Sequence, residues 1–153
     1  MADTTPKGVH PCYANQFSID VTGGDGTTEN NLKTIADMET YSVAIDGNIE
    51  EWTPYDTEGW VRRMVTGKGV TISVNGKRNV GDAGNDYIES IALKTGQDCE
   101  TTFVWNFPSG AKLLMPCVIN VTEWEAADST NVAPLGFEVQ SNGKPTFTPA
   151  PTV

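Results

Sequence analysis

Apolar and polar side chains alternate along most of this chain, and a period of two is the pattern of strands that bury one face. Phe17, Ile19 and Val21 alternate with polar neighbours, and so do Val70, Ile72 and Val74. The pattern predicts seven or eight antiparallel strands, over residues 17–21, 35–45, 49–55, 60–65, 70–74, 103–107, 113–122 and 135–139.

Residues that favour tight turns separate several of these segments. Gly23–Gly26 is predicted to end the first strand, and Asp46-Gly47-Asn48 is predicted to be a hairpin turn. A strand over residues 49–55 would then return beside its predecessor, with Trp52 facing it. Pro54 should confine that strand to an edge or a bulge, because proline cannot donate to a sheet.

One helix is predicted, after a glycine-rich loop that follows Asn75-Gly76. Asp86 is predicted to cap the helix, since Glu89 follows three residues later and the two side chains can accept from the first free amides. Lys94 lies in the expected last turn, and Gly96 can take the left-handed conformation that ends a helix. The apolar side chains Tyr87, Ile88, Ile91 and Ala92 share one face. A helix of about ten residues is too short to stand alone, so it should pack on the sheet.

The segment 113–122 is apolar on both faces, which predicts a strand covered on both sides. The helix could cover one face, and so could another subunit. Pro116 inside this strand requires a bulge or an edge. In the preceding strand the side chains Phe103, Trp105 and Phe107 are expected to face inward, and Thr102, Val104 and Asn106 outward.

These elements predict a mainly β fold in which two antiparallel sheets pack as a sandwich or small barrel, with one α-helix on the flank. Residues 1–153 are expected to form a single domain. Residues 1–15 contain two prolines and no period, which indicates a flexible N-terminal arm. Residues 142–153 form a proline-rich tail that should be extended and exposed.

The charge is strongly acidic, with 20 Asp and Glu against 10 Lys and Arg and a formal net charge of −10. Such a chain repels polyphosphates, so it should not bind DNA specifically. The first residues hold no apolar signal segment, and nowhere do eighteen apolar residues run together. We therefore expect neither export by a recognisable signal nor insertion in a membrane.

The arginines Arg62 and Arg63 stand next to each other in the predicted strand over residues 60–65, so their side chains should point to opposite faces. In a monomer, one of them must find water or a carboxylate. In an oligomer, a guanidinium that faces an acidic neighbour is a natural contact.

Several segments resemble the major tail tube proteins of long-tailed phages of Gram-positive bacteria, over about Ile35 to Pro149. They are WTPYDTEGWVRRMVTGKGVTISVNGKRNVGDAGNDYI, a helix ending in KTG, DSTNVAPLGFEV and GKPTFTP. The resemblance implies a structural virion protein that forms hexameric rings, which stack into a tail tube through which DNA leaves. It also implies assembly in the host cytoplasm and three further tail partners: the tape measure, tail terminator and distal tail proteins. Contacts between rings would involve the stretch Asp46 to Glu58, the first fifteen residues and the tail after Asn142.

A carbohydrate-binding β-sandwich is the alternative function, because exposed tryptophans can stack on sugars. The candidates are Trp52, Trp60, Trp105 and Trp124. Trp105 belongs to the inward pattern and is more consistent with a core position. The other three are spread over different segments, and subunit contacts would explain them equally well.

An enzyme is a weaker hypothesis. The acidic cluster Glu50, Glu51, Asp56 and Glu58 could suggest the paired carboxylates of a glycosidase, but no companion motif accompanies it. The loop from Gly81 to Asp86 lacks the lysine of a phosphate-binding loop, and His10 in a proline-flanked arm is a poor general base. A metal site of His10, Cys12, Cys99 and Cys117 lacks paired spacing. We therefore predict no catalytic, cofactor-binding or metal-binding residues, and free thiols.

Overall fold

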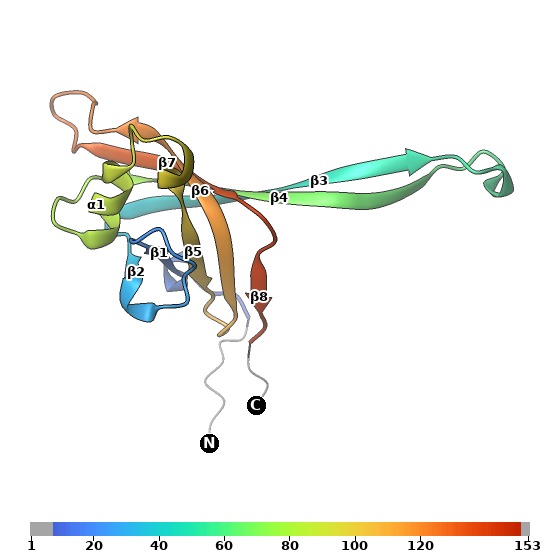
Figure 1. Ribbon diagram of the computed structural model, residues 1–153, viewed down its shortest axis with the longest axis horizontal. Helices are drawn as coiled ribbons and strands as arrows, with labels where there is room; N and C mark the ends of the chain where they lie inside the picture. Colours follow the sequence, from blue (N-terminus) through green and yellow to red (C-terminus); the bar gives the residue numbers. More distant parts are fainter. Residues whose placement is uncertain (1–7, 151–153) are drawn as a thin grey trace, which may run out of the picture.

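The computed structural model describes residues 8–150. Its strands are β1 Gln16–Asp20, β2 Leu32–Thr34, β3 Met38–Trp52, β4 Arg62–Lys77, β5 Glu100–Asn106, β6 Lys112–Trp124, β7 Pro134–Ser141 and β8 Thr146–Thr148. The α-helix is α1 Ala83–Ser90, and the short 3-10 turns are η1 Cys12–Ala14, η2 Glu29–Asn31, η3 Tyr55–Thr57 and η4 Gly96–Cys99. The predicted mainly β architecture with one α-helix is confirmed (Figure 1).

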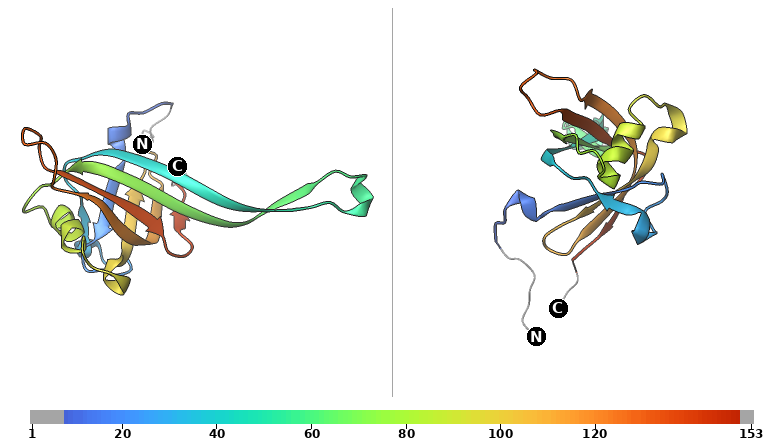
Figure 2. Two further views of the ribbon diagram at one scale, coloured as in Figure 1. Left: turned by 90° about the horizontal axis from the view of Figure 1, so that it is seen from above. Right: turned by 90° about the vertical axis from the view of Figure 1, so that its left-hand side faces the viewer.

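The strands form one open antiparallel sheet in the order β2-β1-β5-β6-β7-β4-β3, and β8 pairs beside β6. The predicted division into two separate packed sheets is therefore wrong. The strands pair without a break, and twist lets the sheet curl around its own core instead (Figure 2). Phe17 of β1 stacks on Tyr41 of β3 with ring centroids 3.7 Å apart, although these strands lie near opposite ends of the order.

The buried core matches most of the predicted inward positions. It comprises Ile19, Ile35, Ile72, Val74, Ile88, Ile91, Phe103, Met115, Cys117, Ile119, Leu135, Phe137 and Val139. In β5, however, the expected outward residues Thr102 and Val104 are also buried. Thr102 donates through its hydroxyl to the carbonyl of Gly24 at 2.9 Å, so the loop after β1 covers this second face.

Helix α1 begins earlier than predicted, at Ala83, and it is capped by Asp82 instead of Asp86. The Asp82 carboxylate accepts from the amides of Asn85 and Ala36, both at 3.1 Å, and thereby ties the helix to the segment after β2. Asp86 lies in the first turn and accepts from the amide of Gly81. The predicted packing on the sheet is confirmed, since α1 contacts β1, β2 and β6.

Arg78 fastens the helix to the end of β4. Its side chain is only 6% exposed and lies 2.8 Å from a carboxylate oxygen of Asp86, with a second ion pair to Glu89. It also donates to the Asn85 side-chain carbonyl at 2.8 Å. The hydrogen bond from Arg78 lowers the pKa of Glu89 below its ordinary value. Helix, strand and loop are therefore joined by a charge network in the body of the protein.

The predicted turn at Asp46-Gly47-Asn48 is wrong, because these residues continue β3 and pair with Gly69, Lys68 and Gly67 of β4. Asn75 and Gly76 likewise lie inside β4. The predicted strand over residues 49–55 is thus the outer part of β3, and the chain turns only after Trp52. Pro54 precedes the 3-10 turn η3, and Glu58 and Gly59 directly after η3 take positive φ of 53° and 89°.

Pro116 lies in β6 opposite Thr102 of β5. Its carbonyl accepts from the amide of Asn142, at the point where the neighbour of β6 changes from β7 to β8. The missing amide hydrogen therefore falls at a gap between β7 and β8, so Pro116 lies at a local edge, one of the two predicted positions. Thr146–Thr148 of the predicted tail is exposed and extended, and it pairs as β8. Residues 1–7 of the predicted arm and 151–153 of the tail lie outside the described residues. None of the helices in the described part of the chain is long and apolar enough to cross a membrane.

Candidate assembly surface

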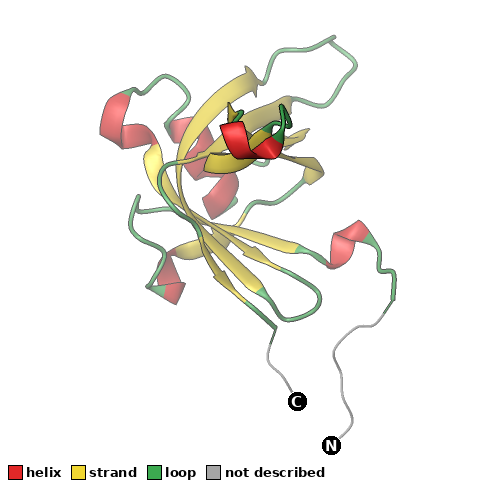
Figure 3. Cartoon of the chain, turned by 90° about the vertical axis from the view of Figure 1, so that its right-hand side faces the viewer, coloured by secondary structure: helices red, strands yellow, loops and turns green. Residues whose placement is uncertain are grey.

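The outer halves of β3 and β4 form a two-stranded ribbon that projects from the body (Figure 1). The neighbouring strand β7 pairs with β4 only from Thr71 to Lys77, so beyond Thr71 the ribbon has no further strand partner. Figure 3 looks along this ribbon from its tip, with the body behind it. Almost every ribbon side chain is exposed. A two-stranded hairpin is marginally stable in water by itself, which makes this ribbon a candidate for contact with another molecule.

One face of the ribbon continues the inner face of the core. Residues opposite each other on paired strands share a face, and Tyr41, Val43, Ile45 and Ile49 follow one another on that face of β3. We call Val43, Ile45, Ile49 and Val65 the apolar ribbon face. These side chains are 41%, 66%, 55% and 52% exposed, respectively. The apolar pattern of the core therefore runs out into solvent without an intramolecular partner.

The opposite face of the same strands is polar, and it extends across four strands in the order β3, β4, β7 and β6. The register aligns Ser42 with Ser73, Glu138 and Asn120 across this sheet. We call this the polar sheet face; towards the ribbon it includes Ala44, Asp46, Asn48 and Glu50. Its side chains are mostly small or acidic, so it offers no cluster of cations to a nucleic acid.

Two strand edges in this region lack a partner in the described residues. The outer edge of β3 ends the sheet. On the other side, β5 pairs with β6 only as far as Val118, so residues 119–124 of β6 have no strand on that side. Unpaired edges of this length invite pairing with another chain.

The two arginines at the outer end of the ribbon lie on opposite faces, as predicted. The Arg62 guanidinium lies 5.7 Å from the centroid of the Trp52 ring, and Arg63 donates to Glu51 at 2.7 Å. Both side chains of the Arg63–Glu51 pair are more than half exposed. Arg63 thus finds its carboxylate within its own hairpin, while Arg62 makes no ion pair with a described residue.

The four carboxylates considered for glycosidase chemistry, Glu50, Glu51, Asp56 and Glu58, lie on this exposed ribbon and its tip. None of them is among the residues that line the three main grooves of the described part of the chain. The ribbon therefore offers no cleft in which two of them could act across a bound substrate.

The tryptophans do not form one sugar-binding platform. Trp105 belongs to an inner aromatic stack with Phe107, with centroids 4.3 Å apart, and donates to the Asn15 side chain at 3.0 Å. Trp52 and Trp60 lie at the ribbon tip, whereas Trp124 pairs with Leu135 at the far end of the sheet. The predicted inward position of Trp105 is confirmed.

The cysteines are free, as predicted, and are not brought together. Cys12 is exposed, whereas Cys99 and Cys117 are buried. Burial raises the pKa of the Cys117 thiol to about 12. Among residues 8–150 no three His, Cys, Asp or Glu side chains lie together as metal ligands would.

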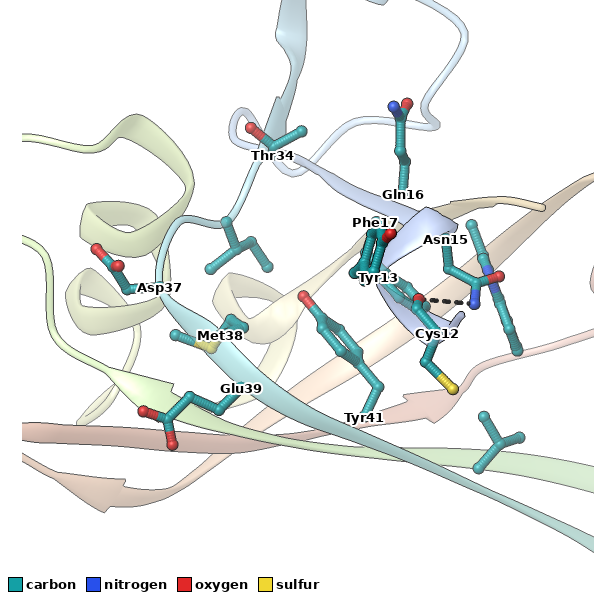
Figure 4. A pocket seen from close by; sticks show the side chains of 13 residues that line it. Cys12, Tyr13, Asn15, Gln16, Phe17, Thr34, Asp37, Met38, Glu39 and Tyr41 are labelled. Carbon is teal, nitrogen blue, oxygen red and sulfur yellow. Dashed lines mark hydrogen bonds between the residues drawn. The ribbon is translucent and has the colours of Figure 1, made fainter. Parts of the chain in front are cut away.

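A groove of about 630 Å³ lies where the two ends of the open sheet meet, and we call it the seam groove (Figure 4). The stacked rings of Phe17 and Tyr41 form part of its wall, and burial raises the pKa of Tyr41 to about 12. Cys12 and Tyr13 border it from the N-terminal side, and Asp37, Glu39 and Val43 border it from the β3 side. Because Val43 lines the groove and also belongs to the apolar ribbon face, the two surfaces are continuous. The sequence pattern did not predict this groove, because it depends on the contact between β1 and β3.

Comparison with known proteins identifies relatives of this architecture. A family model described as phage tail tube protein matches residues 19–147. Among solved structures, the tail of an empty gene transfer agent particle with C6 symmetry is similar at a TM-score of 0.73 and 16% identity, over 92% of this chain and 100% of that one. A chain of the sheath-tube complex of an extracellular contractile injection system is similar at a TM-score of 0.57 and 13% identity, over 90% of each chain. No curated protein sequence matches.

Proposed function

The chain belongs to the phage tail tube protein family, whose role is structural, and on this premise we propose that six copies form a ring and that the rings stack into a tube. DNA passes through the bore without specific binding. The protein works without catalysis, as one tail-tube domain over residues 1–153 in the virion of a long-tailed phage.

The observation that carries the proposal is the pair of open edges on the four strands β6, β7, β4 and β3. Each of these four strands is antiparallel to its neighbour. The first and last strands of such a row of four, β6 and β3, therefore run in opposite directions. If β3 of one copy lies beside residues 119–124 of β6 in the next copy, the antiparallel alternation continues across the junction. Such a contact uses two different patches, so it generates a ring when the rotation closes.

The polar sheet face would then line the bore. The core occupies the other side of these strands, so only this face is available to the interior of a closed barrel. Asp46 and Glu138 lie on it, and the whole chain carries a formal charge of −10. Carboxylates repel phosphates, and small polar side chains offer them few contacts, so DNA can slide along the wall.

Six copies per ring are proposed by analogy with the similar gene transfer agent tail, which has C6 symmetry. The stretch Asp46 to Glu58, residues 1–15 and residues 142–153 are proposed to contact neighbouring rings. The ends of the tube would meet tape measure, terminator and distal tail proteins after assembly in the host cytoplasm, as in phages of Gram-positive hosts.

Negative-stain microscopy of concentrated protein tests this proposal, with native mass spectrometry for the number of copies. We expect rings with a central bore and stacks of such rings. The charge reversals Arg62→Glu and Arg63→Glu should weaken assembly while the circular dichroism spectrum stays that of a folded monomer. A protein that remains monomeric at all concentrations, or one that assembles as sheets without a bore, would overturn the proposal.

A further inference from the structure

We propose that the seam groove of one copy receives the ribbon tip of a second copy in the adjacent ring. This inference rests on the proposed function, and it identifies the surface on which one ring docks against the next. The ribbon tip is here the segment from Trp52 to Arg62, which contains the 3-10 turn η3.

The groove is suited to aromatic side chains. It is lined by the aromatic side chains Phe17, Tyr41 and Trp105, with the apolar side chains Ile35 and Met38. The Tyr13 side chain at its border is 88% exposed, so an aromatic residue already stands at the entrance without cover. A volume of about 630 Å³ accommodates two aromatic side chains of an incoming segment together with some water.

The ribbon tip supplies such side chains. Tyr55 is fully exposed and Trp60 is 78% exposed, which makes them prominent apolar groups at the end of a projecting arm. Exposed aromatic residues that fill a pocket on a partner are the residue types that dominate binding energies at interfaces. Seen from the side, the ribbon points away from the body, so its tip does not reach the groove of its own chain (Figure 1 and the left view of Figure 2). The occupant is therefore a second copy.

The charges at the two surfaces are complementary. Asp37 and Glu39 border the groove, and among residues 8–150 the Glu39 carboxylate has one ion-pair partner, Lys77, at 3.8 Å. Arg62 at the tip makes no ion pair with a described residue, and its guanidinium is already held by the Trp52 ring. A docked tip would bring this arginine towards the acidic border of the groove.

The exposed thiol of Cys12 provides a direct test, because it lines the groove and the other two cysteines are buried. We would introduce Asp56→Cys, which leaves Tyr55 and Trp60 in place at the tip. Mild oxidation of assembled tubes should then join copies covalently, and non-reducing electrophoresis should show a ladder of linked chains. Cys12→Ser in the same background should abolish the ladder. Ser129→Cys, in the loop between β6 and β7, should give no linkage to Cys12 and serves as the matched control.

A second experiment removes the anchor without using a thiol. Trp60→Ala should raise the protein concentration needed for tube formation by about tenfold or more. Leu93→Ala removes another exposed apolar side chain, outside the proposed contact, and should leave that concentration unchanged. Thermal unfolding of the monomer should be the same for both variants and the parent.

The outcomes separate this inference from the proposed function. If tubes form and Asp56→Cys shows no more linkage than Ser129→Cys, the docking of the tip in the groove is overturned while the tube remains. The same holds if Trp60→Ala assembles like the parent protein. If the parent protein forms neither rings nor tubes, the proposed function itself fails, and this inference fails with it. A specific ladder together with impaired stacking of Trp60→Ala supports it.

Discussion

The two halves of the β3–β4 pair differ in burial although their sequences follow the same alternation. Ile72 and Ile45 lie on the same face of these strands, yet Ile72 is fully buried and Ile45 is 66% exposed. The inner half is covered by the curled sheet and α1, whereas the ribbon has only its own two strands. An apolar face in the sequence pattern therefore indicates a covered surface. It does not indicate whether the covering residues belong to the same chain or to another copy.

The largest effect is expected for Ile72→Ala, in the covered half. Removing a buried isoleucine side chain down to Cβ leaves a cavity in a packed core, so the free energy of unfolding should fall by about 2–5 kcal/mol. Urea denaturation of the monomer, followed by tryptophan fluorescence, measures the change. A loss of less than 1 kcal/mol would mean that the inner half is not packed as described.

The next effect concerns the buried arginine of the body. Arg78→Met removes the partner of Asp86 and Glu89 from a site where the arginine side chain is 6% exposed. Because both carboxylates retain some contact with water, we expect a loss of about 2–4 kcal/mol, somewhat below that of a fully buried pair. Urea denaturation at pH 7 checks it, and Arg78→Lys should recover only part of the loss because lysine cannot make the forked contacts.

The free energy of unfolding should depend on pH through Asp20, which is 1% exposed. Burial raises its pKa, but hydrogen bonds from the hydroxyl and amide of Thr22 and from the amide of Gly26 outweigh burial, and the net pKa is lowered. The stabilisation is therefore present above the ordinary aspartate value of 3.8 and is lost as the pH falls through the lowered pKa. Asp20→Asn should cost about 1–3 kcal/mol at neutral pH.

The measurement for Asp20 is a series of urea denaturations from neutral to acidic pH on the parent and the variant. The difference between them should be constant at neutral pH and should shrink below pH 4. A difference that grows as the pH falls would contradict the assigned direction of the shift.

A smaller effect is expected for Arg63→Met on the ribbon. Arg63 pairs with the carboxylate of Glu51, just as Arg78 pairs with carboxylates in the body. Here both side chains are more than half exposed, so the loss should be about 0.2–1 kcal/mol. Comparing the two arginine variants in one denaturation experiment isolates the effect of burial. An equal cost for both would show that the ribbon is not solvent-exposed in solution.

The smallest effect on the monomer is expected for Ile45→Ala, the exposed counterpart of Ile72. Truncating an exposed side chain should change the unfolding free energy by no more than about 0.5 kcal/mol. Assembly, in contrast, should require a higher protein concentration if another copy covers the apolar ribbon face. Sedimentation of tubes at graded concentrations measures this, and an unchanged threshold would show that Ile45 stays in water in the tube.

Much of the core could be predicted from alternation, because the inward positions of β1, β4, β6 and β7 follow the period of two. The course of the chain between the halves of β3 could not, although the turns after β1 and between β5 and β6 could. Asp46-Gly47-Asn48 has the composition of a hairpin turn, but these residues pair with Gly69, Lys68 and Gly67 on the opposite strand, and the register shifts only after Asn48. The helix starts four residues before the predicted cap Asp86, because the Asp82 carboxylate accepts from the amides of Asn85 and Ala36, and the contact with distant Ala36 leaves no local signal in the sequence.

Of the candidate assembly surface, likewise, one part could be predicted from the sequence and another could not. The stretch Asp46 to Glu58, implied by the resemblance, contains the outer part of β3 and most of the ribbon tip. The seam groove was beyond prediction from local pattern, because it forms where Phe17 meets Tyr41 and these residues belong to strands far apart in the sheet order. Contacts that arise from curling a sheet leave no periodic signal in the sequence.

The single projecting ribbon also gives direction to anything built by repeating this molecule. Copies added head to tail all point their arms the same way, so a finished filament has two unlike extremities. One extremity displays unused arms and the other displays vacant grooves. A capping protein that mimics the groove would stop growth at the first, and one that mimics the arm would stop it at the second.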